Sequence, residues 1–267
     1  CRFSTPAMPS NSSGQEYLSI LLSSALSPVG RLCAIPKGQE GILLIGLLCG
    51  YPVGAQNIHQ AYSTGQIDRD TARRMLGFCS NSGPSFIFGA TSLLFDKWYI
   101  PWILWGIQLF TAISVGILLP GRKTQTTVPF VRNRITLSEA LFQSTRALAN
   151  VCGWVILFRT GIEIVSSNFY HMIPDALTVT ITGLLELTNG CIALHQIPEE
   201  GLRFVICCSL LSAGGLCVLM QTKTVTRELG ITTYIKGKML QTIISFFCAS
   251  LLRMVLFPSE ANHTFLN

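Results

Sequence analysis

The sequence predicts an all-α, polytopic integral membrane protein, built as two inverted repeats that each contain a re-entrant or broken helical hairpin. Of the 267 residues, 49% are hydrophobic and only 12% are charged, whereas a soluble domain carries about a quarter charged residues. The apolar residues recur in runs separated by short polar loops, and one bilayer crossing needs about 20 mostly apolar residues. Repeated membrane crossings therefore explain the pattern better than a single large soluble core.

Eight apolar segments follow one another along the chain. They cover residues 17–35, 41–57, 74–95, 100–119, 137–165, 176–195, 202–221 and 239–257. The second segment cannot be one continuous helix, because it contains Gly50-Tyr51-Pro52-Val53-Gly54. The sixth is interrupted by Gly183, Glu186, Asn189 and Gly190. We expect both to be re-entrant hairpins, which are tolerated at membrane depth where protein or a water-filled cavity covers them.

The basic loops support this topology. Cytoplasmic loops of membrane proteins are enriched in Lys and Arg, and with two hairpins every strongly basic loop falls on one side. The loop residues concerned are Arg31, Lys37, Arg69, Arg73, Arg74, Arg122, Lys123, Arg132, Arg134, Lys223, Arg227, Lys236 and Lys238. The opposite side is then nearly neutral. We expect the basic loops to be cytoplasmic.

Each half then holds three crossings and one hairpin, and an odd number of crossings inverts the second half. The repeats cover 17–119 and 137–257, joined by a basic cytoplasmic linker at 120–136. Both halves are also interrupted twice, at 50–54 and 81–85 and then at 188–190 and 212–215. Inverted repeats are a common plan for secondary transporters, and paired broken segments are the best sequence indication of their binding site.

Small polar residues surround the proline of the third segment. Ser80, Asn81, Ser82 and Ser85 flank Gly83-Pro84, where proline removes a backbone donor and disturbs the preceding helical turn. These side chains could simply satisfy the freed backbone groups of a kink. Four of them exceed that need, so we favour a half-helix N-terminus that offers amides and hydroxyls to a solute.

A carboxylate interrupts the sixth segment. Glu186 precedes Thr188 and Asn189, and a carboxylate at mid-membrane costs at least about 2.5 kcal/mol on insertion scales. It can mark a solute path and carry a proton, or it can form a structural ion pair with Arg146 or Arg159. The two readings are compatible.

Three further side chains are weaker solute-binding candidates. Arg146 would suit an anionic solute, while Gln56 and Gln221 follow two of the breaks and could instead cap helix ends. Arg159 and Glu163 are four residues apart and can pair on one helical face.

Nothing in the sequence predicts an enzyme, a cofactor or a metal site. The ten cysteines form no CxxC pair and no Cys/His cluster, and the four histidines fall in loops or at segment ends. Neither a Walker A motif nor a dinucleotide fingerprint is present. The net charge of +6 does not indicate nucleic-acid binding, because the basic residues lie in loops between apolar runs. Since the chain begins at Cys1, we expect that N-terminal residues are missing.

The interrupted segments resemble those of a known family. The motifs are Gly50-Tyr51-Pro52-Val53-Gly54-Ala55-Gln56, Phe78-Cys79-Ser80-Asn81-Ser82-Gly83-Pro84-Ser85-Phe86-Ile87, Gly183-Leu184-Leu185-Glu186-Leu187-Thr188-Asn189-Gly190 and Ser212-Ala213-Gly214-Gly215-Leu216-Cys217-Val218, with Gln221. Over about 26–252 the chain resembles the sporulation integral membrane proteins of the YlbJ type, in the nucleoside-recognition (Gate) domain family. The resemblance implies a sporulation-linked transporter, in a bacterial plasma membrane, of a small organic anion such as dipicolinate or of a nucleoside-like compound.

Two functions are therefore expected. The first is a secondary transporter whose partners are a small solute, a coupling proton or sodium ion, and membrane lipid, with an oligomer left open. The second is a scaffold or sensor for spore development that transports nothing and docks partners or anionic lipid through the basic stretches 69–74 and 122–134.

Overall fold

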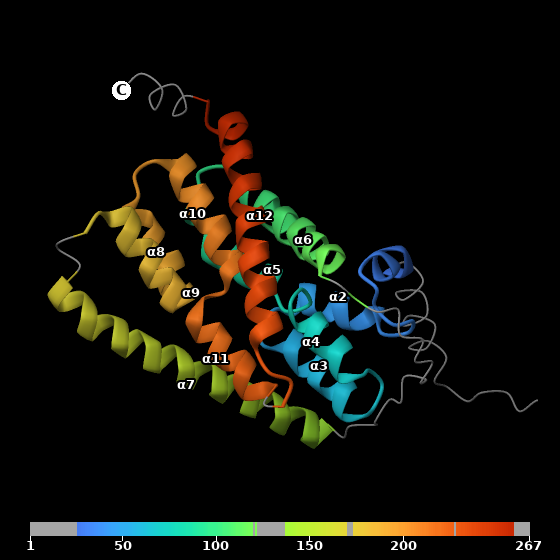
Figure 1. The fold of residues 1–267 in the computed structure, drawn as a ribbon. Helices are drawn as coiled ribbons and strands as arrows, with labels where there is room; N and C mark the ends of the chain where they lie inside the picture. The colour runs from blue at the N-terminus through green and yellow to red at the C-terminus, as the bar shows by residue number, and fades with distance from the viewer. Residues whose placement is uncertain (1–25, 120, 122–136, 170–172, 227, 259–267) are drawn as a thin grey trace, which may run out of the picture.

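The computed structural model describes residues 26–119, 121, 137–169, 173–226 and 228–258. The elements of this part are helical (Figure 1). Their bounds are α2 Glu40–Leu48, α3 Val53–Ser63, α4 Arg69–Leu76, α5 Pro84–Thr91, α6 Ile100–Leu118, α7 Leu137–Phe169, α8 Asp175–Leu185, α9 Leu187–Ala193, η2 Leu194–Gln196, α10 Glu200–Ala213, α11 Gly215–Val225 and α12 Thr232–Leu256. The predicted all-α fold is confirmed for these residues.

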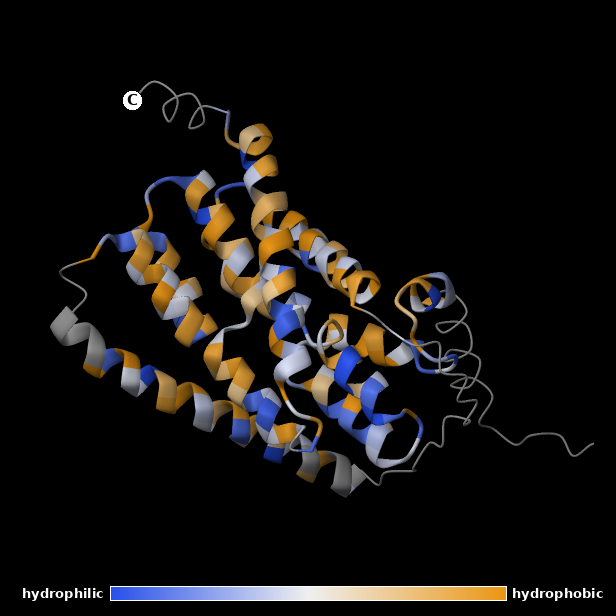
Figure 2. Cartoon of the chain, viewed as in Figure 1, coloured by the Kyte–Doolittle hydropathy of each residue, from blue (hydrophilic) through white to orange (hydrophobic). Residues whose placement is uncertain are grey.

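Four helices within the described ranges are long and apolar enough to cross a membrane. They are α6, the 144–164 part of α7, the broken pair α10–α11, and α12. Hydrophobic residues run along these helices, and hydrophilic ones gather at loops and around α3 and α4 (Figure 2). These helices match four of the predicted crossings and give the chain the makeup of an integral membrane protein. Most of the first predicted segment lies outside the described residues.

The predicted break in 41–57 is a tight turn between two short helices. Helices α2 and α3, with 9 and 11 residues, pack against each other and are each too short to cross a bilayer. A Cβ atom on Gly54 would lie 3.0 Å from the Cα atom of Gly46, and a Cβ on Gly46 would lie 1.8 Å from the carbonyl oxygen of Cys79. The two arms therefore meet through glycine and rest on the backbone of the next broken segment.

A second hairpin has the same construction. Helices α8 and α9 pack together, and a Cβ on Gly190 would lie 2.1 Å from the Cα of Gly183. The turn is at Glu186, whose backbone is extended. The sequence placed this break at 188–190; it occurs earlier because the Glu186 side chain caps the helix that begins immediately after it.

The two remaining breaks differ from each other. Between α4 and α5 the chain leaves the helix from 77 to 83, and Pro84 restarts it at the first helical position, where no N–H is needed. Between α10 and α11 the break is short, because Gly214 and Gly215 have φ of +73° and +78°. Only glycine adopts this left-handed backbone readily.

Polar contacts tie the loops into two separate ends. At one end Arg69 donates to the carbonyl oxygen of Glu228 at 2.8 Å, and Arg73 donates to that of Leu229. At the other end Lys97 donates to the carbonyl of Leu256 at 2.7 Å. Helix α4 and the connection that precedes α12 thus lie side by side at one end. The basic linker 120–136 falls almost wholly outside the described residues.

Two basic residues assigned to loops are buried instead. Arg74 lies in α4, is 6% exposed, and donates to the carbonyl oxygen of Ala34 at 2.6 Å. Lys238 lies well inside α12 and is 4% exposed. Their assignment to loops was wrong because a charged residue at the edge of an apolar run looks like its end, whereas α12 begins at Thr232.

Candidate functional site

All four broken segments contribute to one cavity. It has a volume of about 210 Å³. Its lining residues are Cys49, Gly50 and Tyr51 between α2 and α3, Ser82, Gly83, Ser85 and Phe86 at the start of α5, Glu186, Leu187 and Thr188 at the start of α9, Val218 and Gln221 of α11, and Val151 and Val155 of α7. The chain breaks at the first three of these places because glycine, proline and the Glu186 cap end or restart the helices there. The fourth segment reaches the cavity through α11 and not through its break at Gly214 and Gly215.

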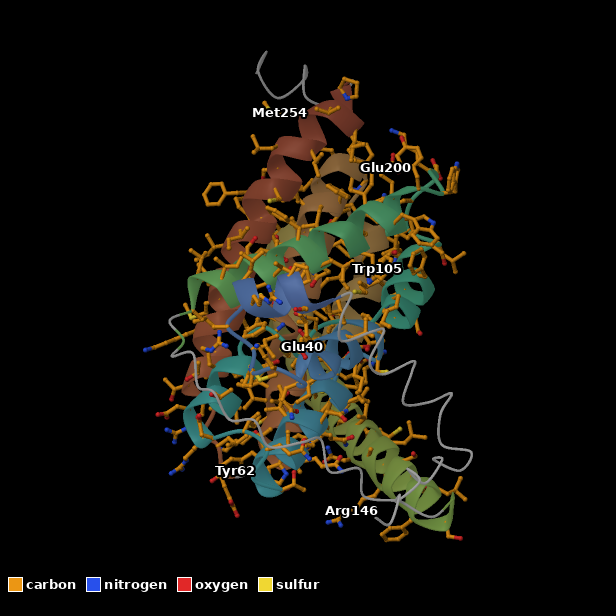
Figure 3. All side chains as sticks on the ribbon, turned by 90° about the vertical axis from the view of Figure 1, so that its right-hand side faces the viewer. Glu40, Tyr62, Trp105, Arg146, Glu200 and Met254 are labelled. Atoms are coloured by element: carbon orange, nitrogen blue, oxygen red, sulfur yellow. The ribbon has the colours of Figure 1, made fainter. Side chains whose placement is uncertain are left out.

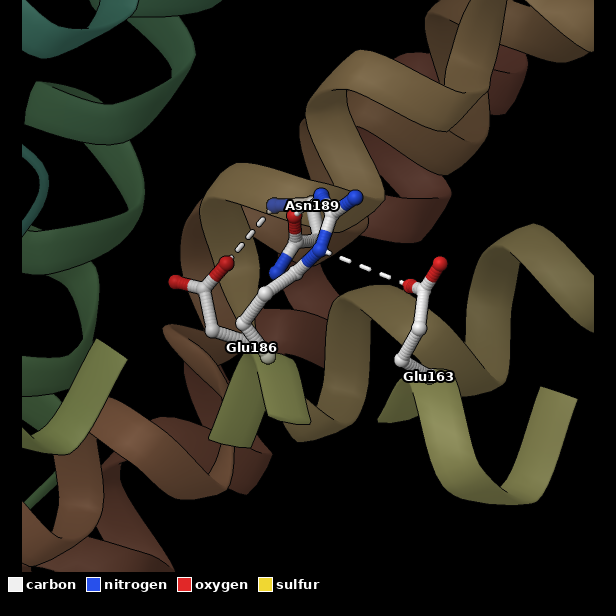
Figure 4. A network of polar contacts seen from close by, with 4 residues as sticks. Glu163, Glu186 and Asn189 are labelled. Carbon is white, nitrogen blue, oxygen red and sulfur yellow. Dashed lines mark hydrogen bonds and ion pairs between the residues drawn. The ribbon is translucent and has the colours of Figure 1, made fainter. Parts of the chain in front are cut away.

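Glu186 is the charged group in the cavity wall. Its side chain is buried, and its two carboxylate oxygens accept hydrogen bonds from the backbone N–H groups of Thr188 at 3.1 Å and Asn189 at 2.7 Å. Figure 4 shows the Glu186 carboxylate turned toward Asn189 at the start of α9. A carboxylate at a helix N-terminus is stabilised by the unpaired amides and the helix dipole.

Glu186 forms no ion pair with Arg146 or Arg159, the two described partners that one reading of the sequence offered. Arg159 donates instead to the side-chain oxygen of Asn189 and pairs with Glu163 at 3.6 Å, as the four-residue spacing predicted. Figure 4 shows Asn189 between the two carboxylates. That reading was wrong for these two arginines, because the backbone amides of Thr188 and Asn189 satisfy the carboxylate of Glu186.

Five of the predicted site residues line the cavity: Ser82, Ser85, Glu186, Thr188 and Gln221. The hydroxyl of Ser82 donates to the carbonyl oxygen of Leu211 at 3.0 Å, so it also joins the two halves of the chain. The amide of Gln221 donates to the Cys217 sulfur at 3.3 Å. Thr188 and Ser85 complete the polar part of the wall.

The other predicted site residues are not in the cavity wall. Asn189 is next to it and held by Arg159. Ser80 is fully buried behind the wall, and Gln56 is half-buried on α3. Arg146 is exposed near the end of α7 that lies away from Glu200 and Met254 (Figure 3).

Asn81 belongs to a second polar cluster that the sequence did not reveal. Its side-chain oxygen accepts a hydrogen bond from Lys238 Nζ at 3.0 Å, and Gln241 Oε1 accepts another at 2.8 Å. The Lys238 ammonium also lies 5.1 Å from the ring centroid of Tyr51, and Tyr51 lines the cavity. The helical spacing of Lys238 and Gln241 was the available signal, because both fall on one face of α12.

The described residues contain no group of three or more His, Cys, Asp or Glu side chains that could hold a metal ion. The nine cysteines described there are free thiols, and six of them are buried. The cavity therefore offers one carboxylate, hydroxyl and amide groups, and apolar walls, which suit reversible binding of a small polar molecule. Compared with known proteins, the chain matches no family model, no curated protein and no solved structure.

Proposed function

We propose that the chain is a secondary transporter that binds a small polar solute in the cavity between its four broken segments. The observation that carries this proposal is their convergence on one cavity of about 210 Å³. Broken helices that meet around an enclosed polar site are the feature by which secondary transporters bind solutes inside a membrane. Transport also accounts for a buried carboxylate at this place, since ionisable groups at membrane depth usually serve ion or solute paths.

Reciprocal helix packing supports the inverted repeat that such a transporter uses. Helix α5 packs against α9, and α11 packs against α3; likewise α4 packs against α12, and α10 against α6. Suppose that the five helices α2 to α6 correspond, in order, to the five helices α8 to α12. The α5–α9 contact is then the counterpart of the α11–α3 contact, and the α4–α12 contact is the counterpart of the α10–α6 contact. The glycine contacts within the two hairpins agree with the same correspondence. Alternating access would then arise as the halves rock around the cavity.

The charge of Glu186 restricts how an acid can bind. Two unit charges 4 Å apart interact by about 4 kcal/mol at an effective dielectric constant of 20, so an anionic solute and an ionised Glu186 oppose each other. Removing that charge, as in Glu186→Gln, should therefore favour the binding of an acid such as dipicolinate. A nucleoside would instead donate hydrogen bonds to the ionised carboxylate. The resemblance to the YlbJ type makes these two the first solutes to test.

The test is binding and flux with purified protein. Glu186→Gln, which removes the charge but keeps an acceptor oxygen, should tighten dipicolinate binding and should not tighten uridine binding. In proteoliposomes, Glu186→Gln should abolish accumulation of the bound solute while the variant remains folded. Normal uptake by this variant would refute the site.

The scaffold alternative has less support from the side chains. It uses the basic stretch 69–74, but all three arginines of this stretch donate to carbonyl groups of this chain. Arg69 donates to Glu228, Arg73 to Leu229 and Arg74 to Ala34. These contacts engage the guanidinium groups that a partner would need. The other stretch of that surface, 122–134, lies outside the described residues.

A further inference from the structure

A buried ammonium group joins the two halves of the chain next to the cavity. Lys238 is 4% exposed, and its Nζ donates to Asn81 Oδ1 at 3.0 Å and Gln241 Oε1 at 2.8 Å. The same atom lies 5.1 Å from the ring centroid of Tyr51 and 6.0 Å from that of Tyr234. All four of these partners are neutral.

The surrounding hydrogen bonds orient both amide oxygens toward Lys238. Gln241 donates through Nε2 to Gln108 Oε1 at 3.3 Å, and Gln108 donates through Nε2 to the Ser212 hydroxyl at 2.7 Å. The amide nitrogen of Asn81 donates to the carbonyl oxygen of Phe78 at 2.7 Å. Since each amide nitrogen has an acceptor elsewhere, each amide oxygen is left to face the lysine.

This arrangement suits a cation at its head. In the series of hydrogen bonds from Lys238 through Gln241 and Gln108 to Ser212, each residue donates to the next. Lys238 therefore acts only as a donor. An ammonium has three N–H donors and no acceptor, so it matches two oxygens directed at it. Two amide oxygens and two aromatic faces are also ligands that attract a monovalent cation in water-poor surroundings.

We propose that the Lys238 ammonium is a tethered cation that fills a cation site between the 50–54 and 77–83 breaks, in place of a bound sodium ion. The site consists of Asn81, Gln241 and the faces of Tyr51 and Tyr234. Because Tyr51 also lines the cavity, the tethered charge holds one cavity wall in place. The core then needs no sodium to bind solute. That consequence for coupling rests on the proposed transport function, whereas occupation of the cation site does not.

The cation site can be tested by chemical rescue. Lys238→Ala removes three methylenes and the ammonium, so the missing fragment is propylammonium. The Tm of the purified protein is measured in propylammonium, tetramethylammonium and sodium chlorides at equal ionic strength, and with neutral propanol. We expect an unchanged wild-type Tm across the three salts. We expect a lower Tm for Lys238→Ala that propylammonium raises in a saturable manner and that tetramethylammonium and propanol do not.

Two controls keep the outcome decisive. Lys236 is exposed on the same helix, so Lys236→Ala should respond to no cation. Lys238→Met keeps most of the length of the side chain without its charge and should have a lower Tm that no cation restores. A sodium-specific rise in the wild-type Tm would overturn the proposal, and this holds even if Lys238→Ala does not fold. So would a Lys238→Met variant as stable as wild type, or a Lys238→Ala variant that propylammonium raises no more than tetramethylammonium.

Flux then tests the coupling consequence separately. If the chain transports, replacing all sodium by choline should leave solute accumulation unchanged, and a sodium requirement would refute this consequence. Absence of any flux would refute the proposed function, while the Tm measurements would still decide whether Lys238 occupies a cation site.

Discussion

The two halves of the chain share glycine-packed hairpins, but charged groups of opposite sign hold their breaks. In the first half, the 77–83 break is held by a cation, the ammonium of Lys238 from α12 bonded to Asn81. In the second half, the turn between α8 and α9 is held by an anion, the Glu186 carboxylate bonded to two backbone amides. A carboxylate thus lines the cavity, and an ammonium lies next to the cavity wall at Tyr51. The comparison separates what both halves share, the glycine-packed hairpins, from what each half does with charge.

Substitutions in the glycine-packed hairpins, which both halves share, should have the largest effect on stability. A Cβ on Gly46 would lie 1.8 Å from the Cys79 carbonyl oxygen, and one on Gly190 would lie 2.1 Å from the Gly183 Cα, while one on Gly41 would meet nothing within 4 Å. We expect Gly46→Ala and Gly190→Ala each to lower the free energy of unfolding by about 3 kcal/mol or more, because backbone must move. Gly41→Ala, also in α2, should be neutral or stabilising.

Thermal unfolding of the purified variants measures this difference. If Gly46→Ala were as stable as Gly41→Ala, hairpin packing on the broken segment would be wrong. If only one of Gly46→Ala and Gly190→Ala were destabilised, the hairpins would differ in construction as well as in charge.

The anionic break should give an intermediate effect. Glu186→Ala leaves the N–H groups of Thr188 and Asn189 without their carboxylate acceptor, which should cost about 1–2 kcal/mol of stability, the range for lost helix caps. Glu186→Gln keeps one acceptor oxygen and should cost less. Tm values for the two variants should therefore fall in the order wild type, Gln, Ala. Equal values for Gln and Ala would show that the charge alone, and not the cap, holds the turn.

The contact that supports Asn189 from α7 should give the smallest effect. The Arg159 side chain is 56% exposed and its ion pair with Glu163 is long, at 3.6 Å, so water screens it. Arg159→Ala should change the free energy of unfolding by at most about 1 kcal/mol. A drop as large as that of Glu186→Ala would mean that α7 holds the second hairpin in place.

Much of the helical organisation could be predicted from hydropathy and helix breakers. Gly50–Gly54, Pro84 and Gly214–Gly215 mark breaks that the structure contains, since these residues act locally. Ser82, Glu186 and Gln221 were placed near one another because the breaks of a transporter-like repeat meet. The four helices that are long and apolar enough to cross a bilayer could be predicted from the length of the apolar runs alone.

Lys238 and Asn81 show what the sequence could not reveal. They are far apart along the chain, and their hydrogen bond depends on how α12 packs against the 77–83 break. Hydropathy assigns a lysine beside an apolar run to a loop, since burial of a charge is recognised only when its partners are known. The same limit applies to Glu186, whose partners are backbone amides that no residue pattern displays.

The central claim is that the cavity containing Glu186 binds the solute that is transported. The most direct measurement is uptake of labelled dipicolinate and uridine into proteoliposomes along an imposed pH gradient, with wild type and Glu186→Gln compared side by side. We expect wild type to accumulate one of the two above equilibrium, and Glu186→Gln to remain folded without accumulating it. Equal accumulation by both proteins, or accumulation of neither solute by wild type, would contradict the account.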